Sequence, residues 1–405
     1  MGSANGGCSR RGFVGVLAGA ASGLVGCSTS TGSSSESVPS RAPGSPGTVS
    51  PSPAKTTSAP APAGPRPLYL GTYTSAEGGG NGIGVARYDP DSGRITGTGT
   101  VTGVTNPSYL AVHPDGRTLY AVDEQDAGAV TAVRLPDRKV LGSRSTGGAG
   151  PCHLSVHPGG RWLLSANYGS GSVTVHPIDS SGALGERRDT VTHSSPAPGP
   201  GQEGPHAHQF LTSPDGGHVL AVDLGTDTVY SYRLNERTGA LTEVSQAHTR
   251  AGAGPRHLTF HPGGRYAYLA NEADNTVAVC AYDRRTGRLS VGAAQSTGTG
   301  SGTNYPAQLL VTANGSYAYL ANRGHNSLTR YAVEADGARL RLLDTVAVNG
   351  DFPRQIAFSP DGTLLFAANQ RSSTVSVFHV DTTGGELRHA GEPFASPVAV
   401  CALPL

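Results

Sequence analysis

Two histidines in the segment Pro205-His-Ala-His208 form the most unusual pair of polar side chains in this sequence. Farther along the chain, Arg256 follows a proline, and Glu272 and Arg323 each follow an asparagine. A histidine can transfer protons near neutral pH, and an arginine can stabilise a developing negative charge. These residue types together are those of acid–base catalysis on a substrate that becomes negatively charged.

These residues belong to a sequence motif that recurs along the chain. Each copy begins with a proline and an alternating strand, followed by a Pro-Asp-Gly or Pro-Gly-Gly turn and a second apolar strand. Seven such prolines lie 44 to 54 residues apart, at Pro107, Pro151, Pro205, Pro255, Pro306, Pro353 and Pro397. This period is that of a four-stranded propeller blade.

The two ends of the repeat region complement each other. The last copy, from Pro397, contains only a first strand, whereas residues 68–101 contain a second, a third and a fourth strand. Pairing the two ends would complete one blade and remove the free sheet edges. The sequence therefore predicts an all-β, seven-bladed β-propeller over residues 67–405, with four-stranded antiparallel blades and a ring closed by its terminal strands.

Comparing the repeats separates scaffold from candidate site. The turn histidines His113, His157 and His261 recur, which indicates a turn-capping role. Six residues before the turn, the equivalent positions instead vary widely: Ser108, Cys152, His208, Arg256, Ala307 and Arg354. Antiparallel pairing puts them beside the ends of the second strands, which hold Glu124, Asn167-Tyr168, Asn271-Glu272, Asn322-Arg323 and Asn369-Gln370. We expect both sets to ring one mouth of the central channel.

The copy that begins at Pro205 is two residues longer than the others before its turn. This insertion predicts a bulge that directs His206 and His208 into the channel. Two surface histidines in a loop are the alternative. No third metal-binding residue occurs at ligand spacing, so a zinc site is not expected.

Several phrases together resemble the lactonase family of seven-bladed propellers, which includes bacterial 6-phosphogluconolactonases and the fungal carboxymuconate-lactonizing enzyme. They are Gly71-Thr-Tyr-Thr, Pro107-Ser-Tyr-Leu, Gly150-Pro-Cys-His-Leu-Ser-Val, Ala166-Asn-Tyr-Gly, Pro205-His-Ala-His, Gly254-Pro-Arg-His-Leu, Asn271-Glu and Asn322-Arg-Gly-His. The resemblance implies metal-independent hydrolysis of a small lactone without a cofactor. It places the family's proposed catalytic set on His208, Arg256, Glu272 and Arg323. Further polar residues are expected to bind the substrate, namely His153, His206, Tyr168, Arg354, Gln308 and Glu124.

In this hypothesis Arg256 and Arg323 bind the oxyanion or a substrate carboxylate, and His208 transfers the proton. Glu272 either orients the other groups or acts as the base. A structural salt bridge between Arg256 and Glu272 is the alternative. No G-x-S-x-G motif is present, so a serine nucleophile is not expected.

The resemblance has departures that affect the substrate. Gln308 follows Ala307 and Gln355 follows Arg354 where many relatives have other residues. An unphosphorylated sugar lactone or a dicarboxylic lactone is the preferred substrate class. Two alternatives stay open: a binding propeller without catalysis, and an enzyme that works in the lactonizing direction. Carboxylates are too few for a calcium-dependent lactonase, and the single tryptophan, Trp162, argues against WD40 repeats.

The N-terminal residues read as a targeting segment. Arg10-Arg11 and the apolar stretch after them predict a twin-arginine signal over residues 1–27, ending in the lipobox Leu24-Val-Gly-Cys27. Cys27 would carry the lipid, and the Ser/Pro/Thr-rich residues 28–66 would form a tether. An ordinary cleaved signal is the alternative. The expected location is the outer face of the cytoplasmic membrane, with the lipid anchor as the membrane contact.

The charge balance limits the partners. Lys and Arg number 30 against 29 Asp and Glu, without any block of one sign, so a nucleic-acid partner is not expected. A small-molecule lactone and a monomeric protein fit this balance. Cys152, Cys280 and Cys401 show no CxxC spacing, and we expect no disulfide framework.

Overall fold

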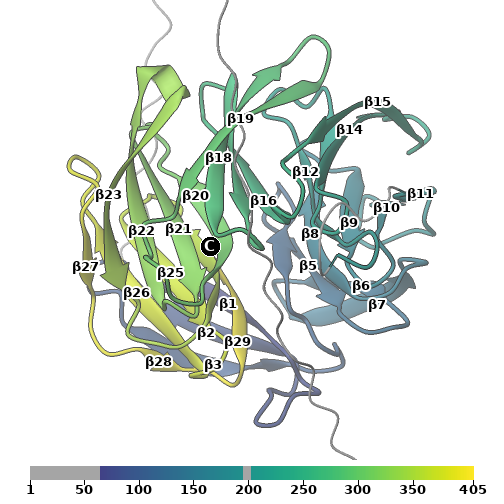
Figure 1. The fold of residues 1–405 in the computed structure, drawn as a ribbon. Helices are drawn as coiled ribbons and strands as arrows, with labels where there is room; N and C mark the ends of the chain where they lie inside the picture. Colours follow the sequence, from purple (N-terminus) through teal and green to yellow (C-terminus); the bar gives the residue numbers. More distant parts are fainter. Residues whose placement is uncertain (1–63, 195–201) are drawn as a thin grey trace, which may run out of the picture. The chain divides into compact units, whose positions relative to one another are not determined.

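A computed structural model describes residues 64–194 and 202–405. In these ranges the chain forms seven antiparallel sheets around a central axis (Figure 1). The predicted signal, the lipidation site at Cys27 and nearly all of the predicted tether lie outside the described residues. None of the helices within the described ranges has the length and apolarity needed to cross a membrane.

The blades are numbered here in chain order. Blade 1 contains β4 (Leu110–Val112), β5 (Thr118–Asp123), β6 (Ala129–Arg134) and β7 (Lys139–Ser145). Blade 2 contains β8 (Pro151–Val156), β9 (Trp162–Asn167), β10 (Ser172–Pro177) and β11 (Asp189–Thr192). Blade 3 contains β12 (Ala207–Thr212), β13 (Val219–Asp223), β14 (Thr228–Leu234) and β15 (Leu241–His248). Blade 4 contains β16 (Pro255–Phe260), β17 (Tyr266–Asn271), β18 (Thr276–Asp283) and β19 (Arg288–Ser296).

The last three blades follow the same order. Blade 5 contains β20 (Tyr305–Val311), β21 (Tyr317–Arg323), β22 (Ser327–Glu334), the short 3-10 helix η1 (Ala335–Gly337) and β23 (Arg339–Ala347). Blade 6 contains β24 (Pro353–Phe358), β25 (Leu364–Asn369), β26 (Thr374–Val380), β27 (Leu387–His389) and β28 (Phe394–Ala395). Blade 7 contains β29 (Ala399–Pro404), β1 (Arg66–Thr72), β2 (Ile83–Tyr88) and β3 (Ile95–Val101). In blade 6 the fourth strand is interrupted, and both β27 and β28 pair with β26.

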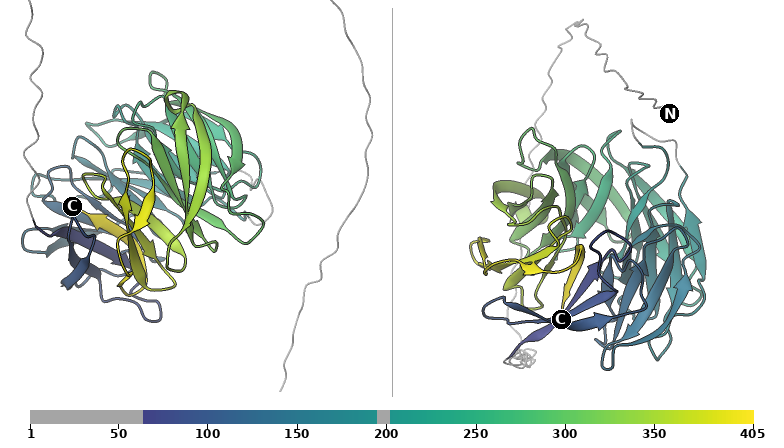
Figure 2. Two further views of the ribbon diagram at one scale, coloured as in Figure 1. Left: turned by 90° about the vertical axis from the view of Figure 1, so that its left-hand side faces the viewer. Right: turned by 90° about the horizontal axis from the view of Figure 1, so that it is seen from below.

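Blade 7 closes the ring with strands from both ends of the repeat region. The C-terminal β29 pairs antiparallel with β1, in a register that runs from Leu68↔Pro404 to Gly71↔Cys401. In Figure 2 the yellow C-terminal strand accordingly lies beside the purple N-terminal strands. The prediction of seven blades and of this closure is confirmed.

The hydrophobic core lies between the blades. Seven clusters of buried apolar side chains are present, one at each contact between neighbouring blades. At the contact of blades 4 and 5, for example, Tyr268 packs with Leu309 and Tyr331. The hydroxyl of Tyr268 donates a hydrogen bond of 3.0 Å to the carbonyl of Gly337 in blade 5, so the ring is buried without leaving its polar end unpaired.

The turn histidines also link neighbouring blades. Nδ1 of His113 accepts a hydrogen bond of 3.2 Å from the amide of Asp115, and its Nε2 lies 2.8 Å from the carbonyl of Gly160 in the next blade. His157 and His261 make the equivalent pair of contacts. The turn-capping interpretation therefore agrees with the structure, and these histidines lie at the turns rather than at the predicted site. Cys152, Cys280 and Cys401 are free thiols, as expected.

Candidate active site at the channel mouth

A bulge near the start of the first strand recurs in six blades. The strand pairing skips between Pro151 and His153, Ala207 and Gln209, Pro255 and His257, Pro306 and Leu309, Pro353 and Gln355, and Ala399 and Cys401. The skipped residues are Cys152, His208, Arg256, the pair Ala307-Gln308, Arg354 and Val400. A bulge releases a side chain from the regular alternation of the strand. Five of the six varied positions singled out by the repeat comparison thus lie at these bulges, and Ser108 lies ahead of β4.

The bulge at His208 was expected, but the insertion does not cause it. Five other blades have the same irregularity without an insertion, and the extra residues Pro205 and His206 lie ahead of β12. In blade 5 Ala307 and Gln308 lie opposite Ala321, so one residue is extra there as well. Ala307 is fully buried, and Gln308 lines the cavity at the place that His153, His257 and Gln355 hold in their blades.

A narrow cavity lies beneath the mouth of the channel. Five of the predicted site residues line it, namely His153, His208, Arg256, Gln308 and Arg354. The other lining residues are Ser108, Tyr109, Cys152, His257, Gln355 and Val400. The centre of a water molecule can occupy about 20 Å³ of this space. That is room for one or two waters, so a sugar-sized ligand has to lie above the cavity, at the mouth.

Glu272 joins the two arginines of the predicted catalytic set. Its Oε2 lies 2.9 Å from Nε of Arg256 and forms an ion pair with Nη2 of Arg323. Arg323 also donates hydrogen bonds of 3.2 and 3.4 Å to the carbonyls of Tyr305 and Pro306. Burial alone would raise the pKa of Glu272, but Arg323 and Arg256 hold it below its ordinary value. The carboxylate therefore stays ionised, and it fixes the positions of two guanidinium groups.

Arg323 lies between two aromatic rings of the rim. Its guanidinium carbon is 6.0 Å from the ring centre of Tyr305 and 5.3 Å from that of Phe352. Phe352 has a φ of 67°, which is unusual for an aromatic residue, whereas glycines occupy this place before the prolines of blades 2 and 4. The strained backbone of Phe352 thus occurs at a residue whose ring contacts Arg323 of the predicted site.

His208 is a neutral imidazole that lies next to the ring of Tyr168, on which His206 is stacked. Burial, with Arg256, Arg354 and Arg323, lowers the pKa of His208 well below its ordinary value. Its Nδ1 is buried without a hydrogen-bond partner among the described residues. The ring of Tyr168 lies 5.8 Å from it, edge to face, and is stacked on its other side by His206 at 4.5 Å. His208 is therefore unprotonated near neutral pH, and one of its ring nitrogens is free of protein hydrogen bonds in the described part of the chain.

Glu124 and Arg354 lie together in another part of the mouth. The hydroxyl of Tyr73 donates to both carboxylate oxygens of Glu124, at 3.1 and 3.0 Å, and Ser108 also donates to this carboxylate. The guanidinium carbon of Arg354 is 5.7 Å from the ring centre of Tyr73. Burial opposes the charge of Arg354, but Tyr73 and Glu124 nevertheless hold its pKa above the ordinary value.

The asparagines at the ends of the second strands do not belong to the mouth. Asn167, Asn271, Asn322 and Asn369 are almost fully buried. Each donates to a serine or threonine of the third strand, as Asn322 does to Ser327 at 3.1 Å and Thr329 at 2.8 Å. These asparagines are therefore scaffold, and the prediction that they ring the channel is wrong. The following residue, such as Tyr168, Glu272 or Arg323, is the one that reaches the site.

Three site residues were missed or misread. Tyr73 follows the second strand of blade 7, as Glu124 and Glu272 follow the second strands of blades 1 and 4. His257 occupies the place in blade 4 that His153 occupies in blade 2. Extending the repeat comparison to these two positions would have identified Tyr73 and His257. Gln355 binds both backbone groups of Ala402 in the next blade, at 3.2 and 2.7 Å. Its amide thus links blade 6 to blade 7. Because Gln355 also lines the cavity, its effect on substrate choice stays a prediction.

Asp223 positions the segment that carries His206 and His208. Its Oδ1 accepts hydrogen bonds from the amides of His206, Gly225 and Thr226, and its Oδ2 lies 2.6 Å from Nδ1 of His193. The substitution Asp223→Asn removes part of this clamp. We expect kcat to fall by about tenfold per folded molecule, because misplacing a reacting group by a fraction of an ångström is costly.

The readout that separates positioning from simple destabilisation is kcat per active site, with the folded fraction measured by circular dichroism. Asp215→Asn is the matched control, since Asp215 caps the turn at the other end of the same hairpin. A variant at Asp223 with normal kcat and lower stability would contradict the positioning role.

The buried histidines also make stability depend on pH. Burial lowers the pKa of His153 to about 3 and that of His257 well below its ordinary value. In the unfolded chain these side chains bind protons below about pH 6.5, and in the folded protein they do not. The free energy of unfolding should therefore fall as the pH is lowered from 7 to 5, by up to about 1.4 kcal/mol per pH unit for each such histidine.

Urea unfolding of the wild type and of His257→Gln at pH 7, 6 and 5 isolates one of these groups. Glutamine is suitable because Gln209 and Gln355 occupy the same place in blades 3 and 6. The variant should lose less stability on acidification than the wild type. Equal losses would show that His257 is protonated in the folded protein.

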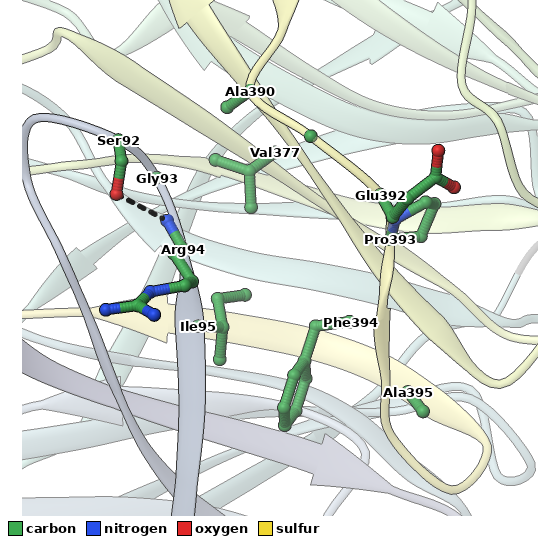
Figure 3. Close-up of a pocket in the computed structure, with 11 residues that line it drawn as sticks. Ser92, Gly93, Arg94, Ile95, Val377, Ala390, Glu392, Pro393, Phe394 and Ala395 are labelled. Atoms are coloured by element: carbon green, nitrogen blue, oxygen red, sulfur yellow. Dashed lines mark hydrogen bonds between the residues drawn. The ribbon is translucent and has the colours of Figure 1, made fainter.

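A second hollow lies between blades 6 and 7, away from the predicted site residues (Figure 3). Its lining includes Val377, Ala390 and Phe394, with Arg94 and Glu392 beside them. Ser92 Oγ accepts a hydrogen bond of 3.4 Å from the amide of Arg94. No group of three or more His, Cys, Asp and Glu suited to hold a metal ion occurs in residues 64–194 and 202–405. The acid–base and anion-stabilising groups are gathered at the channel mouth instead.

The fold and the site define a seven-bladed β-propeller with a charged pocket at one mouth of its channel. The family model described as "Lactonase, 7-bladed beta-propeller" matches residues 67–404. The chain belongs to this family, and the resemblance drawn from its motifs is confirmed.

Relatives with descriptive names agree with this assignment. A 6-phosphogluconolactonase of Bacillus subtilis (strain 168) is 32% identical over 342 residues, covering 82% of this chain and 96% of that protein. The solved structure of a periplasmic gluconolactonase of Pseudomonas aeruginosa is 30% identical with a TM-score of 0.78, over 84% of this chain and 99% of that one. A putative 6-phosphogluconolactonase of Bacteroides fragilis NCTC 9343 is 28% identical with a TM-score of 0.77, over 87% and 100%. The prediction of a lactonase is thus supported at the level of the family.

Proposed function

We propose that the protein hydrolyses a small, unphosphorylated lactone, either a sugar lactone or a carboxylactone, without a metal ion. The observation that carries the proposal is the neutral His208 beside Arg256, around a cavity of the size of a water molecule. The ion pairs of Glu272 support it, because they hold two guanidinium groups at the mouth above this cavity.

The chemistry follows from these positions. A water in the cavity gives a proton to Nδ1 of His208 as its oxygen bonds to the lactone carbonyl carbon. The carbonyl oxygen becomes negatively charged, and Arg256 stabilises that charge, with Arg323 beside it. The ring C–O bond then breaks, and the leaving oxygen takes the proton from the imidazolium. The product is the open hydroxy acid.

Two further features of the proposal concern the setting of the reaction. Arg10-Arg11 and Cys27 support export and a lipid anchor at the outer face of the membrane. A phosphorylated cytosolic intermediate would seldom occur there, which favours an unphosphorylated substrate.

The guanidinium groups take the place of a metal ion as the stabiliser of the oxyanion.

A panel of sugar lactones and carboxylactones tests the proposal, with and without EDTA. Purified protein should hydrolyse at least one unphosphorylated lactone, measured as acid release at constant pH, and EDTA should leave the rate unchanged. Absence of hydrolysis across the panel would favour a propeller that only binds its ligand, and loss of activity with EDTA would contradict the metal-independent mechanism.

A further inference from the structure

In residues 64–194 and 202–405, one of the three arginines described at the channel mouth has no ion-pair partner. Glu272 pairs with Arg256 and Arg323, and Arg323 is also bound to two backbone carbonyls. Arg354 makes no hydrogen bond and no ion pair with any residue of the described ranges, although it lines the same cavity. Its one specific contact is with the ring of Tyr73.

The nearest carboxylate in this part of the mouth, that of Glu124, is held elsewhere. Glu124 accepts hydrogen bonds from the hydroxyls of Tyr73 and Ser108, and in the described part of the chain it lies beyond ion-pair distance of Arg354. The guanidinium of Arg354 is only partly buried, so its hydrogen-bond donors are left to water. An anionic group of a ligand could take the place of that water and form a charge-assisted hydrogen bond with Arg354.

The formal charges of the mouth point to the number of negative charges on that ligand. Three guanidinium groups, those of Arg256, Arg323 and Arg354, face two carboxylates, those of Glu124 and Glu272. The buried histidines of the cavity, His153, His208 and His257, are neutral, since burial lowers their pKa values. One positive charge is therefore left over.

We propose that Arg354 binds an acid group of the substrate, so that the preferred lactone carries a single negative charge. This proposal rests on the proposed function and names its substrate class. A carboxylate fits the planar fork of a guanidinium with two parallel hydrogen bonds. A phosphate monoester could use the same fork, but at neutral pH it carries close to two negative charges and would leave one unbalanced.

The position of Arg354 suits this role. It occupies the bulge of blade 6, and Arg256 occupies the same bulge of blade 4. A lactone whose carbonyl lies at Arg256 and His208 can therefore direct a substituent across the mouth to Arg354. Recognition of the acid group is separate from the chemistry at the carbonyl.

Three lactones that differ in charge test the proposal: neutral D-glucono-1,5-lactone, a glucaric acid lactone with one free carboxylate, and 6-phosphogluconolactone. The wild type should hydrolyse the monocarboxylate with a kcat/KM about 10- to 100-fold above that of the neutral lactone, as a charged hydrogen-bonded pair provides. Arg354→Gln should abolish this preference, and Arg354→Lys should retain part of it. Within one variant, the ratio of kcat/KM for the monocarboxylate to kcat/KM for the neutral lactone does not depend on how much of the sample is folded.

Arg371→Gln is the matched control. Arg371 is an exposed arginine of the same blade that stacks on Phe352 and does not line the cavity, so the ratio should stay at the wild-type value. An equal loss on both lactones in Arg354→Gln, or no preference in the wild type, overturns the proposal. A preference for the phosphorylated lactone overturns its single-charge part.

A pair of inert ligands keeps this proposal distinguishable from the proposed function. If the wild type hydrolyses none of the three lactones, the proposed function fails. Tetrahydropyran-2-carboxylate should still raise the Tm of the wild type, whereas neutral tetrahydropyran-2-methanol should not, and Arg354→Gln should lose the shift. Equal shifts for the acid and the alcohol, or no shift with the acid, would contradict an anion site at Arg354.

Discussion

Replacing His208 by glutamine should lower kcat for lactone hydrolysis by about 10²- to 10⁴-fold, the usual contribution of a general base. Glutamine can fill the buried site and keep a hydrogen-bonding group, but it cannot accept a proton from water. The measurement is kcat on whichever lactone the wild type hydrolyses best. His389→Gln is the control, because His389 is exposed on β27, away from the channel lining, and its replacement should leave kcat unchanged.

The pH profile of the wild type tests the same assignment independently. Because burial and the neighbouring arginines lower the pKa of His208, its imidazole stays neutral well below pH 6.5. We therefore expect kcat/KM to show no fall between pH 7 and 6, and a decline only at lower pH. A decline centred near pH 6.5 would indicate an exposed histidine as the base, and an unchanged kcat in His208→Gln would exclude His208.

Deleting the last strand should unfold the propeller. β29 supplies Ala399, Val400, Cys401 and Ala402 to the closing blade, all of them buried. Their loss exposes the edge of β1 and the core between blades 6 and 7, and a domain has only about 5 to 15 kcal/mol of stability to lose. A chain that ends at Pro397 should show no cooperative thermal transition at the wild-type temperature.

The control is a chain that lacks only Leu405, whose amide donates one hydrogen bond to the carbonyl of Pro67. It should retain a cooperative transition within a few degrees of the wild type. A folded, cooperatively melting chain without β29 would show that closure by the terminal strands is dispensable.

The repeated prolines were sufficient to predict the architecture from the sequence. They recur once per blade, and the incomplete copies at the two ends predicted the closing pair β1 and β29. Both features are local patterns of turns and alternating strands, which depend on nearby residues. The resemblance of short motifs to a family added the catalytic roles predicted for His208, Arg256, Glu272 and Arg323.

The errors arose where strand pairing, rather than pattern, decides which way a side chain points. Asn322 and Arg323 are neighbours at the end of β21, yet the first is bound inside the blade and the second reaches Glu272 in blade 4. Ala307 occupies the bulged place in blade 5 but is fully buried and does not line the cavity, whereas the predicted site residue Gln308 beside it does. The repeat pattern predicts that a strand is present and leaves its bulges undetermined.

A crystal structure with a lactam analogue of the hydrolysed lactone tests the central claim most directly, since the amide ring mimics the substrate and resists hydrolysis. The account predicts that the lactam lies at the channel mouth, with its carbonyl oxygen within hydrogen-bonding distance of Arg256 and its ring next to His208. A lactam bound in the hollow between blades 6 and 7 (Figure 3), or at the turns on the other side of the ring, would contradict it.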